Sequence, residues 1–269
     1  MKTAKALLAL VAASALALTG CGSSPSERSA EGLKGQTIAV AFDSDGPPFV
    51  ISDNGTLSGF DVDIMDEIAK RSGFTLERKP LPFDGVLPAL LAGQAQIGAA
   101  AISITDKRKE VVDFSTPYFR TGIVLATRPD SLVQTAEDLK GRSVAVRTGS
   151  NNSQYIEQLP FASEIEIHRY NTTNEQLTAV LSGIDDAVAN DGSILDFYIA
   201  KQGQGKLEVR GPLLTEDDYG YAVPKDRPDV REAIDTSLLA MVADGTYSKI
   251  YQKYFGKEPE ASSLPGKLD

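Results

Sequence analysis

Strand-like and helix-like segments alternate along most of this chain, and this alternation restricts it to a few architectures. Residues 37–42 and 143–146 are short apolar runs typical of strands that are buried on both faces. Amphipathic segments alternate with such runs, including residues 60–72, which end at Gly73, and residues 228–243. Strands that alternate with helices predict an α/β fold with mainly parallel sheets.

Helix starts are predicted from side chains that can accept a backbone hydrogen bond in the first turn. Asp84, Thr105 and Thr173 are the candidate N-cap residues, and Thr246 is expected to begin the last helix.

One pattern occurs twice. Residues 90–100 and 180–189 each predict the end of a helix, a glycine stop and a strand of small residues. Polar groups follow both strands, at 103–108 and at 190–191. Because ligands of open α/β sheets bind beyond the carboxyl ends of the strands, a ligand is expected between two similar halves.

The N-terminus predicts export. Lys2 and Lys5 precede an apolar run at 6–18, which is too short to span a bilayer comfortably and suits a secretory signal. Small residues then lead to Cys21, and the whole segment 1–20 resembles a bacterial lipoprotein signal peptide. That resemblance implies lipidation of Cys21 and an extracytoplasmic protein anchored to the cell membrane. An accidental thiol is the alternative.

Composition narrows the possible partners. The formal net charge is −10, which argues against nucleic acid, and the single cysteine rules out an internal disulfide. Residues 21–34 are polar and contain Gly, Ser and Pro, so we expect a flexible tether there, and residues 258–269 are expected to form a loose tail. The acidic run 216–218 is expected to be solvated surface.

Arg108 is an unusual residue for its place. Thr105 as N-cap puts Arg108 in the first turn of a short helix, where the helix dipole disfavours a cation. A bound anion would explain it, because the arginine fork matches a carboxylate and Ser103 can add a hydroxyl. An exposed arginine paired with Asp106 or Glu110 explains it equally well.

Asp191 also has two interpretations. At the end of a strand it can simply cap the helix that runs to Ala200. Alternatively, its carboxylate accepts hydrogen bonds from a ligand ammonium. Arg108 on one half and Asp191 on the other would then recognise a zwitterion, the backbone of a free α-amino acid.

Six motifs occur in a fixed order along the chain. They are GFDVDI at 59–64, FDGVLPAL at 83–90, ISITDKR at 102–108, VDFSTPY at 112–118, DLKG at 138–141 and DGTY at 244–247. Together they resemble family 3 solute-binding proteins of ABC importers, which bind polar amino acids, and the likeness is strongest to glutamine binders. The resemblance covers residues 35 to 259.

That resemblance implies a two-lobed, type II periplasmic-binding-protein-like fold whose lobes close over the ligand about two hinge strands. By analogy lobe 1 comprises residues 36–118 and 220–257, and lobe 2 comprises residues 123–214. The hinge strands would lie near 119–122 and 215–219. A permease of an ABC importer is the implied partner, the protein is expected to be a monomer, and neither a cofactor nor a metal is expected.

The family pattern also implies ligand-binding residues. Arg108 matches the arginine that holds the α-carboxylate, and Ser103 matches a contact to both the amine and the carboxylate. The Ala101 carbonyl and Asp191 match contacts to the amine. The remaining matches are Ser150 and Asn151 near the carboxylate, Phe83 as a wall of the side-chain pocket, and Asp43 and Arg147 at the end of the ligand side chain.

Gly46 departs from the pattern, because relatives usually carry an aromatic residue there. Either the pocket is wider or more polar as a result, or Phe49 or Tyr155 compensates. Glutamine or glutamate is the favoured ligand: Arg147 beside Asp43 would suit an amide, whereas Arg147 free of Asp43 would favour glutamate. A dominant Asp43 or Asp45 would favour a basic amino acid.

An enzyme and a ligand sensor are the two alternative classes of protein. A dehydratase-like enzyme on the same fold needs a placed acid or base. Asp43, Asp45 and Asp191 are candidates, but no pair of them is marked as catalytic, and His168, the single histidine, is expected on a surface strand. A ligand sensor would have to act through a separate receptor.

Overall fold

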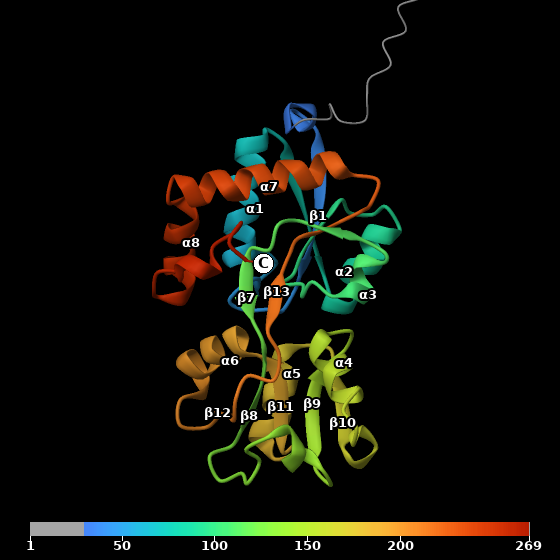
Figure 1. Cartoon of the computed structure of the whole chain (residues 1–269), viewed down its shortest axis with the longest axis vertical. Helices are drawn as coiled ribbons and strands as arrows, with labels where there is room; N and C mark the ends of the chain where they lie inside the picture. Colours follow the sequence, from blue (N-terminus) through green and yellow to red (C-terminus); the bar gives the residue numbers. More distant parts are fainter. Residues whose placement is uncertain (1–29, 269) are drawn as a thin grey trace, which may run out of the picture.

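The computed structural model describes residues 30–268, which form two lobes stacked along the long axis of the molecule (Figure 1). Each lobe is built around one five-stranded sheet. We call lobe 1 the lobe that contains β1 (Thr37–Asp43) and lobe 2 the lobe that contains β9 (Ser143–Arg147). Parallel pairings lie in both sheets, and the predicted α/β fold is confirmed.

In lobe 1 the strand order is β4-β1-β5-β14-β6. Strand β1 pairs in parallel with β4 and β5, whereas β14 runs antiparallel to β5 and β6. The partner strands are β4 (Thr75–Leu81), β5 (Ile97–Ala99), β6 (Asp113–Phe114) and β14 (Ala222–Val223). Strand β14 follows lobe 2 in the sequence, so the chain returns to complete the sheet of lobe 1.

In lobe 2 the order is β10-β9-β11-β8-β12. Strand β9 pairs in parallel with β10 and β11, and β8 is antiparallel to its neighbours β11 and β12. The partner strands are β8 (Ile123–Thr127), β10 (Glu166–Tyr170), β11 (Ala187–Asp191) and β12 (Glu208–Arg210).

Helices cover these sheets (Figure 1). Lobe 1 carries α1 (Phe60–Ser72), α2 (Phe83–Leu91), α3 (Asp106–Lys109), α7 (Pro228–Ala243), α8 (Thr246–Phe255), the short η2 (Ala30–Leu33) and η6 (Ala261–Ser263), and a hairpin of β2 (Ile51–Asp53) and β3 (Thr56–Ser58). Lobe 2 carries α4 (Asn151–Glu157), α5 (Thr173–Ser182), α6 (Gly192–Tyr198), the π-helical η5 (Ile199–Gly203), η3 (Ala136–Leu139) and η4 (Ala162–Glu164). Among the helices of residues 30–268, none is both long enough and apolar enough to cross a bilayer.

Both faces of each sheet are buried, because successive side chains of a strand point to opposite faces and apolar side chains pack against each face. In β1, Ile38, Val40 and Phe42 belong to one apolar cluster and Ala41 to another. This double burial explains why the central strands read as continuous apolar runs.

Two strands join the lobes, β7 (Phe119–Thr121) and β13 (Asp217–Tyr219), which pair in antiparallel register. Figure 1 shows them side by side where the lobes meet.

Part of the acidic run 216–218 lies in β13. The prediction that this run is solvated surface is wrong for two of its residues: Asp218 pairs with Arg120 at 2.8 Å, and Asp217 accepts a hydrogen bond from Thr215 at 2.5 Å.

Three of the predicted helix boundaries hold. Helix α1 ends at the left-handed Gly73, the Thr105 hydroxyl caps α3 by accepting from the Arg108 amide at 3.3 Å, and α8 begins at Thr246.

Two N-cap predictions are wrong, by two residues for α2 and by one residue for α5. Helix α2 begins at Phe83 directly after the extended Pro82, so Asp84 lies within its first turn. Thr172, not Thr173, caps α5, because only Thr172 stands three residues before Glu175 and forms a reciprocal capping box with it.

Candidate ligand-binding site

A polar cavity lies between the lobes at the carboxyl ends of their parallel strands. Asp43 ends β1, Arg147 ends β9 and Asp191 ends β11. The space that the centre of a water molecule could occupy is about 20 Å³, so the lobes are closed upon each other. Lobe 1 contributes Asp43, Gly46, Phe83, Ala100, Ala101 and Ser103; lobe 2 contributes Arg147, Ser150, Asn151, Asn152, Asn190, Asp191 and Ile194.

The sequence predicted most of this lining. Every residue proposed as ligand-binding lines the cavity except Arg108, which lies beside it under the ring of Phe83, with its guanidinium carbon 5.6 Å from the ring centroid. Ala100, Asn152 and Ile194 were missed. Ile194 stands in the first turn of α6, where nothing in the sequence separates a cavity wall from an ordinary core residue.

Arg108 is only 6% exposed. Its Nη1 donates to the Ser103 carbonyl at 2.8 Å, and its Nη2 reaches the Gly149 carbonyl of lobe 2 at 3.2 Å. Within residues 30–268 no carboxylate forms an ion pair with it, so an exposed pairing with Asp106 or Glu110 is excluded. Burial lowers the pKa of Arg108, although Asp191 and other neighbours act against this. The site therefore holds a buried guanidinium without a counter-anion.

Asp191 carries the opposite charge, and one of its two carboxylate oxygens lacks a hydrogen-bond donor among residues 30–268. Its Oδ2 accepts from the Tyr219 hydroxyl at 2.5 Å, while its buried Oδ1 has no hydrogen-bond partner in the described part of the chain. The side chain makes no capping bond to α6, which excludes the capping interpretation. Burial raises the pKa of Asp191 to about 6. A buried carboxylate oxygen without a donor is costly unless a ligand supplies one.

Asp43 and Arg147 form a buried ion pair across the lobes. Arg147 Nη1 lies 2.6 Å from Asp43 Oδ2, and its Nη2 lies 2.8 Å from Oδ1, a two-bond fork. The Arg147 guanidinium carbon also lies 5.1 Å from the centroid of the Phe83 ring. Phe83 thus faces both guanidinium groups of the site.

Gly46 makes room for this pair. A Cβ atom there would come within 2.6 Å of Asp43 Oδ2. The expectation that Phe49 or Tyr155 compensates for the missing aromatic is wrong. Phe49 is fully buried in lobe 1, 4.9 Å from the Phe119 ring centroid, and Tyr155 packs in the core of lobe 2. The ion pair occupies the space instead.

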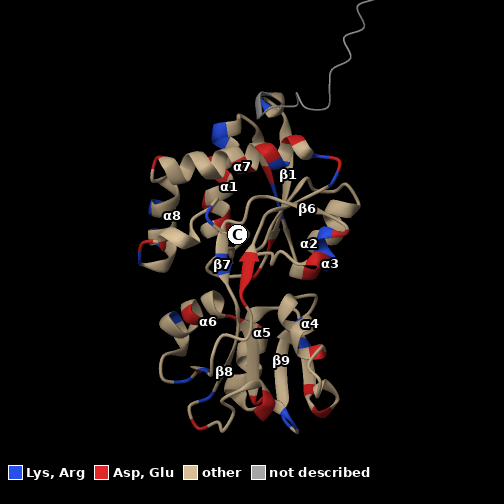
Figure 2. Cartoon of the chain, in the orientation of Figure 1, with Lys and Arg blue, Asp and Glu red and all other residues tan. Residues whose placement is uncertain are grey.

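Ser150 and Asn151 follow the left-handed Gly149, at the start of α4. The Ser150 hydroxyl donates to the Arg147 carbonyl at 2.8 Å and accepts from the Ser153 amide at 3.1 Å. The Asn151 amide donates to Asp217 of β13 at 3.0 Å, which ties the loop to a link strand. Figure 2 shows β13 as the red strand between the lobes.

A chain of buried amides supports the lobe 2 side. Asn152 donates to Asn190 at 3.1 Å, and Asn190 donates to Gln176 at 2.9 Å. The Asn190 oxygen also accepts from the Asp191 amide at 2.8 Å. Buried polar networks of this kind fix the geometry of what they touch, here the backbone of Asp191.

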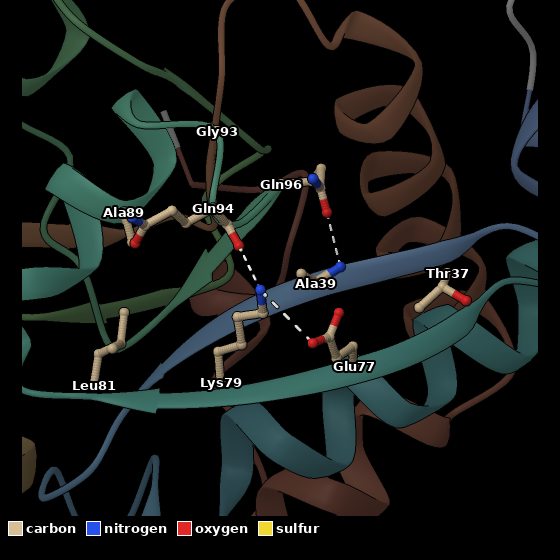
Figure 3. A pocket seen from close by; sticks show the side chains of 9 residues that line it. All are labelled: Thr37, Ala39, Glu77, Lys79, Leu81, Ala89, Gly93, Gln94 and Gln96. Carbon is tan, nitrogen blue, oxygen red and sulfur yellow. Dashed lines mark hydrogen bonds and ion pairs between the residues drawn. The ribbon is translucent and has the colours of Figure 1, made fainter.

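Two other polar places are not part of this site. The hollow of Figure 3 lies beside β4, and its Lys79 already donates to the Gln94 carbonyl at 2.9 Å. His168 lies partly exposed on β10 and contacts Asp185 at 2.7 Å. No cluster of His, Cys, Asp and Glu within residues 30–268 could hold a metal ion.

Fold and cleft together define a two-lobed binding protein of the type II periplasmic-binding-protein class. The chain belongs to the bacterial extracellular solute-binding proteins, family 3, whose model matches residues 38–257. The resemblance in the motifs is thereby confirmed. The lipidation predicted for Cys21 falls outside the described residues. The expected tether 21–34 and loose tail 258–269 are wrong in part, because Leu33 is fully buried in the core of lobe 1, Leu264 packs against that core, and Leu268 is buried.

Known relatives match over almost their whole length. A probable histidine-binding protein of Neisseria gonorrhoeae is 33% identical, covering 96% of this chain and 98% of the relative. The ABC transporter glutamine-binding protein GlnH of Bacillus subtilis is 34% identical, covering 94% and 97%. The crystal structure of the arginine-, lysine-, histidine-binding protein ArtJ of Geobacillus stearothermophilus superposes with a TM-score of 0.80 at 31% identity, covering 84% and 98%. Each of these relatives is an amino-acid-binding protein by name.

Proposed function

We propose that this chain is the extracytoplasmic solute-binding component of an ABC importer, and that it closes over a polar amino acid, with glutamine favoured, and delivers it to the membrane permease. The proposal rests on two buried charged groups at the cleft, Arg108 and Asp191. Among residues 30–268, no carboxylate forms an ion pair with Arg108, and no group donates a hydrogen bond to Asp191 Oδ1.

A free α-amino acid meets both needs. Its carboxylate accepts two parallel hydrogen bonds from the Arg108 fork, and its ammonium donates to Asp191 and to the Ala101 carbonyl. Hydrogen bonds to charged groups contribute roughly 1.5–3 kcal/mol each, and several of them in a closed cleft offset the cost of ordering the ligand. Because Arg108 and Ala101 lie in lobe 1 and Asp191 in lobe 2, the ligand favours closure.

The Asp43–Arg147 pair supports a neutral ligand side chain. Each charge already has its partner, at 2.6 and 2.8 Å. Glutamate would have to draw Arg147 away from Asp43, and arginine would have to draw Asp43 away from Arg147. An amide offers one donor and one acceptor to the intact pair, which favours glutamine over glutamate. The glutamine-binding relative agrees with this choice, and the histidine-binding relative makes histidine the next candidate.

The remaining parts of the proposal concern the chain as a whole. Residues 36–118 with 220–257 and residues 123–214 act as the two closing lobes, and the segments near 119–122 and 215–219 act as hinges. Cys21 carries the lipid anchor after removal of residues 1–20, the segment between Cys21 and η2 lets the body reach the permease, and the protein works as a monomer.

Calorimetry of the purified protein, first freed of bound ligand by unfolding and refolding, tests the function. We expect heat with glutamine at micromolar affinity and weaker or no heat with glutamate and arginine. Silence with all twenty amino acids, in protein shown to be refolded, would refute the amino-acid binder.

Ligand affinity and stability are expected to respond to acid in opposite directions. Burial raises the pKa of Asp191 from 3.8 to about 6. Only the ionised carboxylate attracts an ammonium group, so the affinity falls by about tenfold per pH unit below 6. For the free protein the raised pKa gives stability that is fully present below 3.8 and lost as the pH rises through 6. Asp61, with a pKa raised to about 7 by burial, acts in the same direction.

Titrations of ligand at pH 7.5, 6 and 5, with melting curves of the free protein, measure both trends. His168 also has a raised pKa, because of its bonds to Asp185 and Glu166, although its partial burial acts the other way. The variant His168→Gln is therefore the control and should keep the full loss of affinity. An affinity that stays constant from pH 7.5 to 5 would contradict the role of Asp191.

A further inference from the structure

Asp61 is a wholly buried carboxylate that does not line the cavity. It is the second residue of α1 and is 0% exposed. Its Oδ2 accepts from the backbone amide of Ala101 at 2.9 Å, and its Oδ1 accepts from the Tyr221 hydroxyl at 3.4 Å. A buried carboxylate persists only where hydrogen bonds compensate for its lost hydration. The shorter of these two bonds goes to a single backbone amide beside the ligand cleft.

Ala101 has an unfavourable backbone conformation. Its φ is 48°, in the left-handed region that residues with a Cβ atom disfavour. Within residues 30–268 the only other non-glycine residue with positive φ is Asn54, in the turn between β2 and β3, where asparagine is tolerated. Alanine has no side-chain hydrogen bond to stabilise such a turn. Surrounding contacts must therefore hold it in place.

The strained residue, Ala101, lies in the wall of the ligand cavity. Ala101 follows β5 by two residues and lines the cavity, with Ala100 on one side and Ser103 close behind. The left-handed turn sets the direction of the backbone between the strand and Ser103. If Ala101 relaxed to an ordinary extended conformation, the carbonyl proposed to accept the ligand ammonium would turn with it.

We propose that Asp61 is a positioning residue for amino-acid binding: by accepting the Ala101 amide it holds Ala101 in the left-handed conformation that presents the ammonium-binding backbone. This inference rests on the proposed function. Asp61 never touches the ligand, and its effect reaches the cleft through one backbone hydrogen bond.

Three variants separate this role from a general role in folding. Asp61→Leu has a similar size and no acceptor. Asp61→Asn keeps an oxygen for the Ala101 amide, and its N–H groups can donate to the Tyr221 hydroxyl. Ala101→Gly, added to Asp61→Leu, supplies a residue that adopts positive φ without help.

We expect Asp61→Leu to raise the Kd for glutamine by about tenfold or more, and Asp61→Asn to raise it by less than about threefold. The double variant Asp61→Leu/Ala101→Gly should recover most of the lost affinity, although it restores no contact of Asp61. Calorimetry measures the affinities, and melting curves of the ligand-free variants report on folding. Asp61→Ala replaces Asp61→Leu if the latter does not fold.

The inference is overturned if Asp61→Leu binds as the wild type does, or if Ala101→Gly gives no recovery. A loss that Asp61→Asn shares in full would also overturn it, since that variant keeps the acceptor. These results differ from a failure of the proposed function, in which the wild-type protein itself binds no amino acid.

Discussion

Replacing Arg108 with alanine should abolish useful amino-acid binding, with the Kd for glutamine rising by about a hundredfold or more. The guanidinium is proposed to donate two hydrogen bonds to the ligand carboxylate, each worth roughly 1.5–3 kcal/mol. The change also removes the bonds from Arg108 to the Ser103 and Gly149 carbonyls, the second of which joins the lobes. Arg108→Lys keeps the charge but not the fork, so its affinity should lie between the two.

Calorimetry with glutamine measures this loss of affinity. Two further variants test whether the loss is specific to the zwitterion site. Asp191→Ala should cause a similar loss, because the ligand ammonium then lacks its counter-charge. Arg169→Ala is the matched control: Arg169 lies on the surface of lobe 2, 49% exposed and paired with Glu157, and its loss should leave the affinity unchanged. Full affinity in Arg108→Ala would remove the basis of the zwitterion site.

Breaking the Asp43–Arg147 pair from either side should reverse the ligand preference. Asp43→Ala leaves Arg147 buried without an anion, and glutamate can then supply one. Arg147→Met leaves Asp43 buried without a cation, and arginine or lysine can supply that. Removing one partner of a buried pair typically costs about 3–5 kcal/mol, part of which a ligand of the missing sign recovers. We expect the preference between glutamine and the charged ligand to shift by at least tenfold in each variant.

Gly46→Ala offers a milder test of the same pair. The added Cβ would lie 2.6 Å from Asp43 Oδ2, so the carboxylate must move and the fork must weaken. Glutamine affinity should fall while charged ligands gain relative to it. Arg169→Ala, which breaks its exposed pair with Glu157 in lobe 2, is again the control and should leave the preference as it is. An unchanged ranking of ligands in Asp43→Ala and Arg147→Met would show that the pair does not select the side chain.

The parts of the fold that the sequence predicted are those set by local pattern. The apolar run in β1 and the stripe of α1 with its Gly73 stop are properties of neighbouring residues, and the structure has both. Strand β14 is different: it has two residues and forms only because it pairs with β5 and β6 from far away in the chain. The choice of Thr172 over Thr173 depends on the spacing to Glu175, which is visible in the sequence.

The residues of the candidate site also fall into those that a local pattern predicts and those that it does not. The sequence alone marks Arg108 as a candidate because a cation is disfavoured in the first turn of a helix, and it marks Asp191 because this residue ends a strand. Asp43, Phe83 and Arg147 came from the family resemblance alone. The pairing of Asp43 with Arg147, the amide chain behind Asn190 and the bond from Asp61 to Ala101 join residues distant in sequence, so no local pattern could reveal them.

The return of the chain to β14 has a consequence for the order of folding. The sheet of lobe 1 cannot be completed until β14 meets β5 and β6, and all of lobe 2 lies in the intervening loop. Closing so long a loop costs conformational entropy. If lobe 2 folds first, its own sheet brings β7 and β13 together, and the loop that remains to be closed is short. We therefore expect lobe 2 to act as the early folding unit, with lobe 1 completed around its already joined ends.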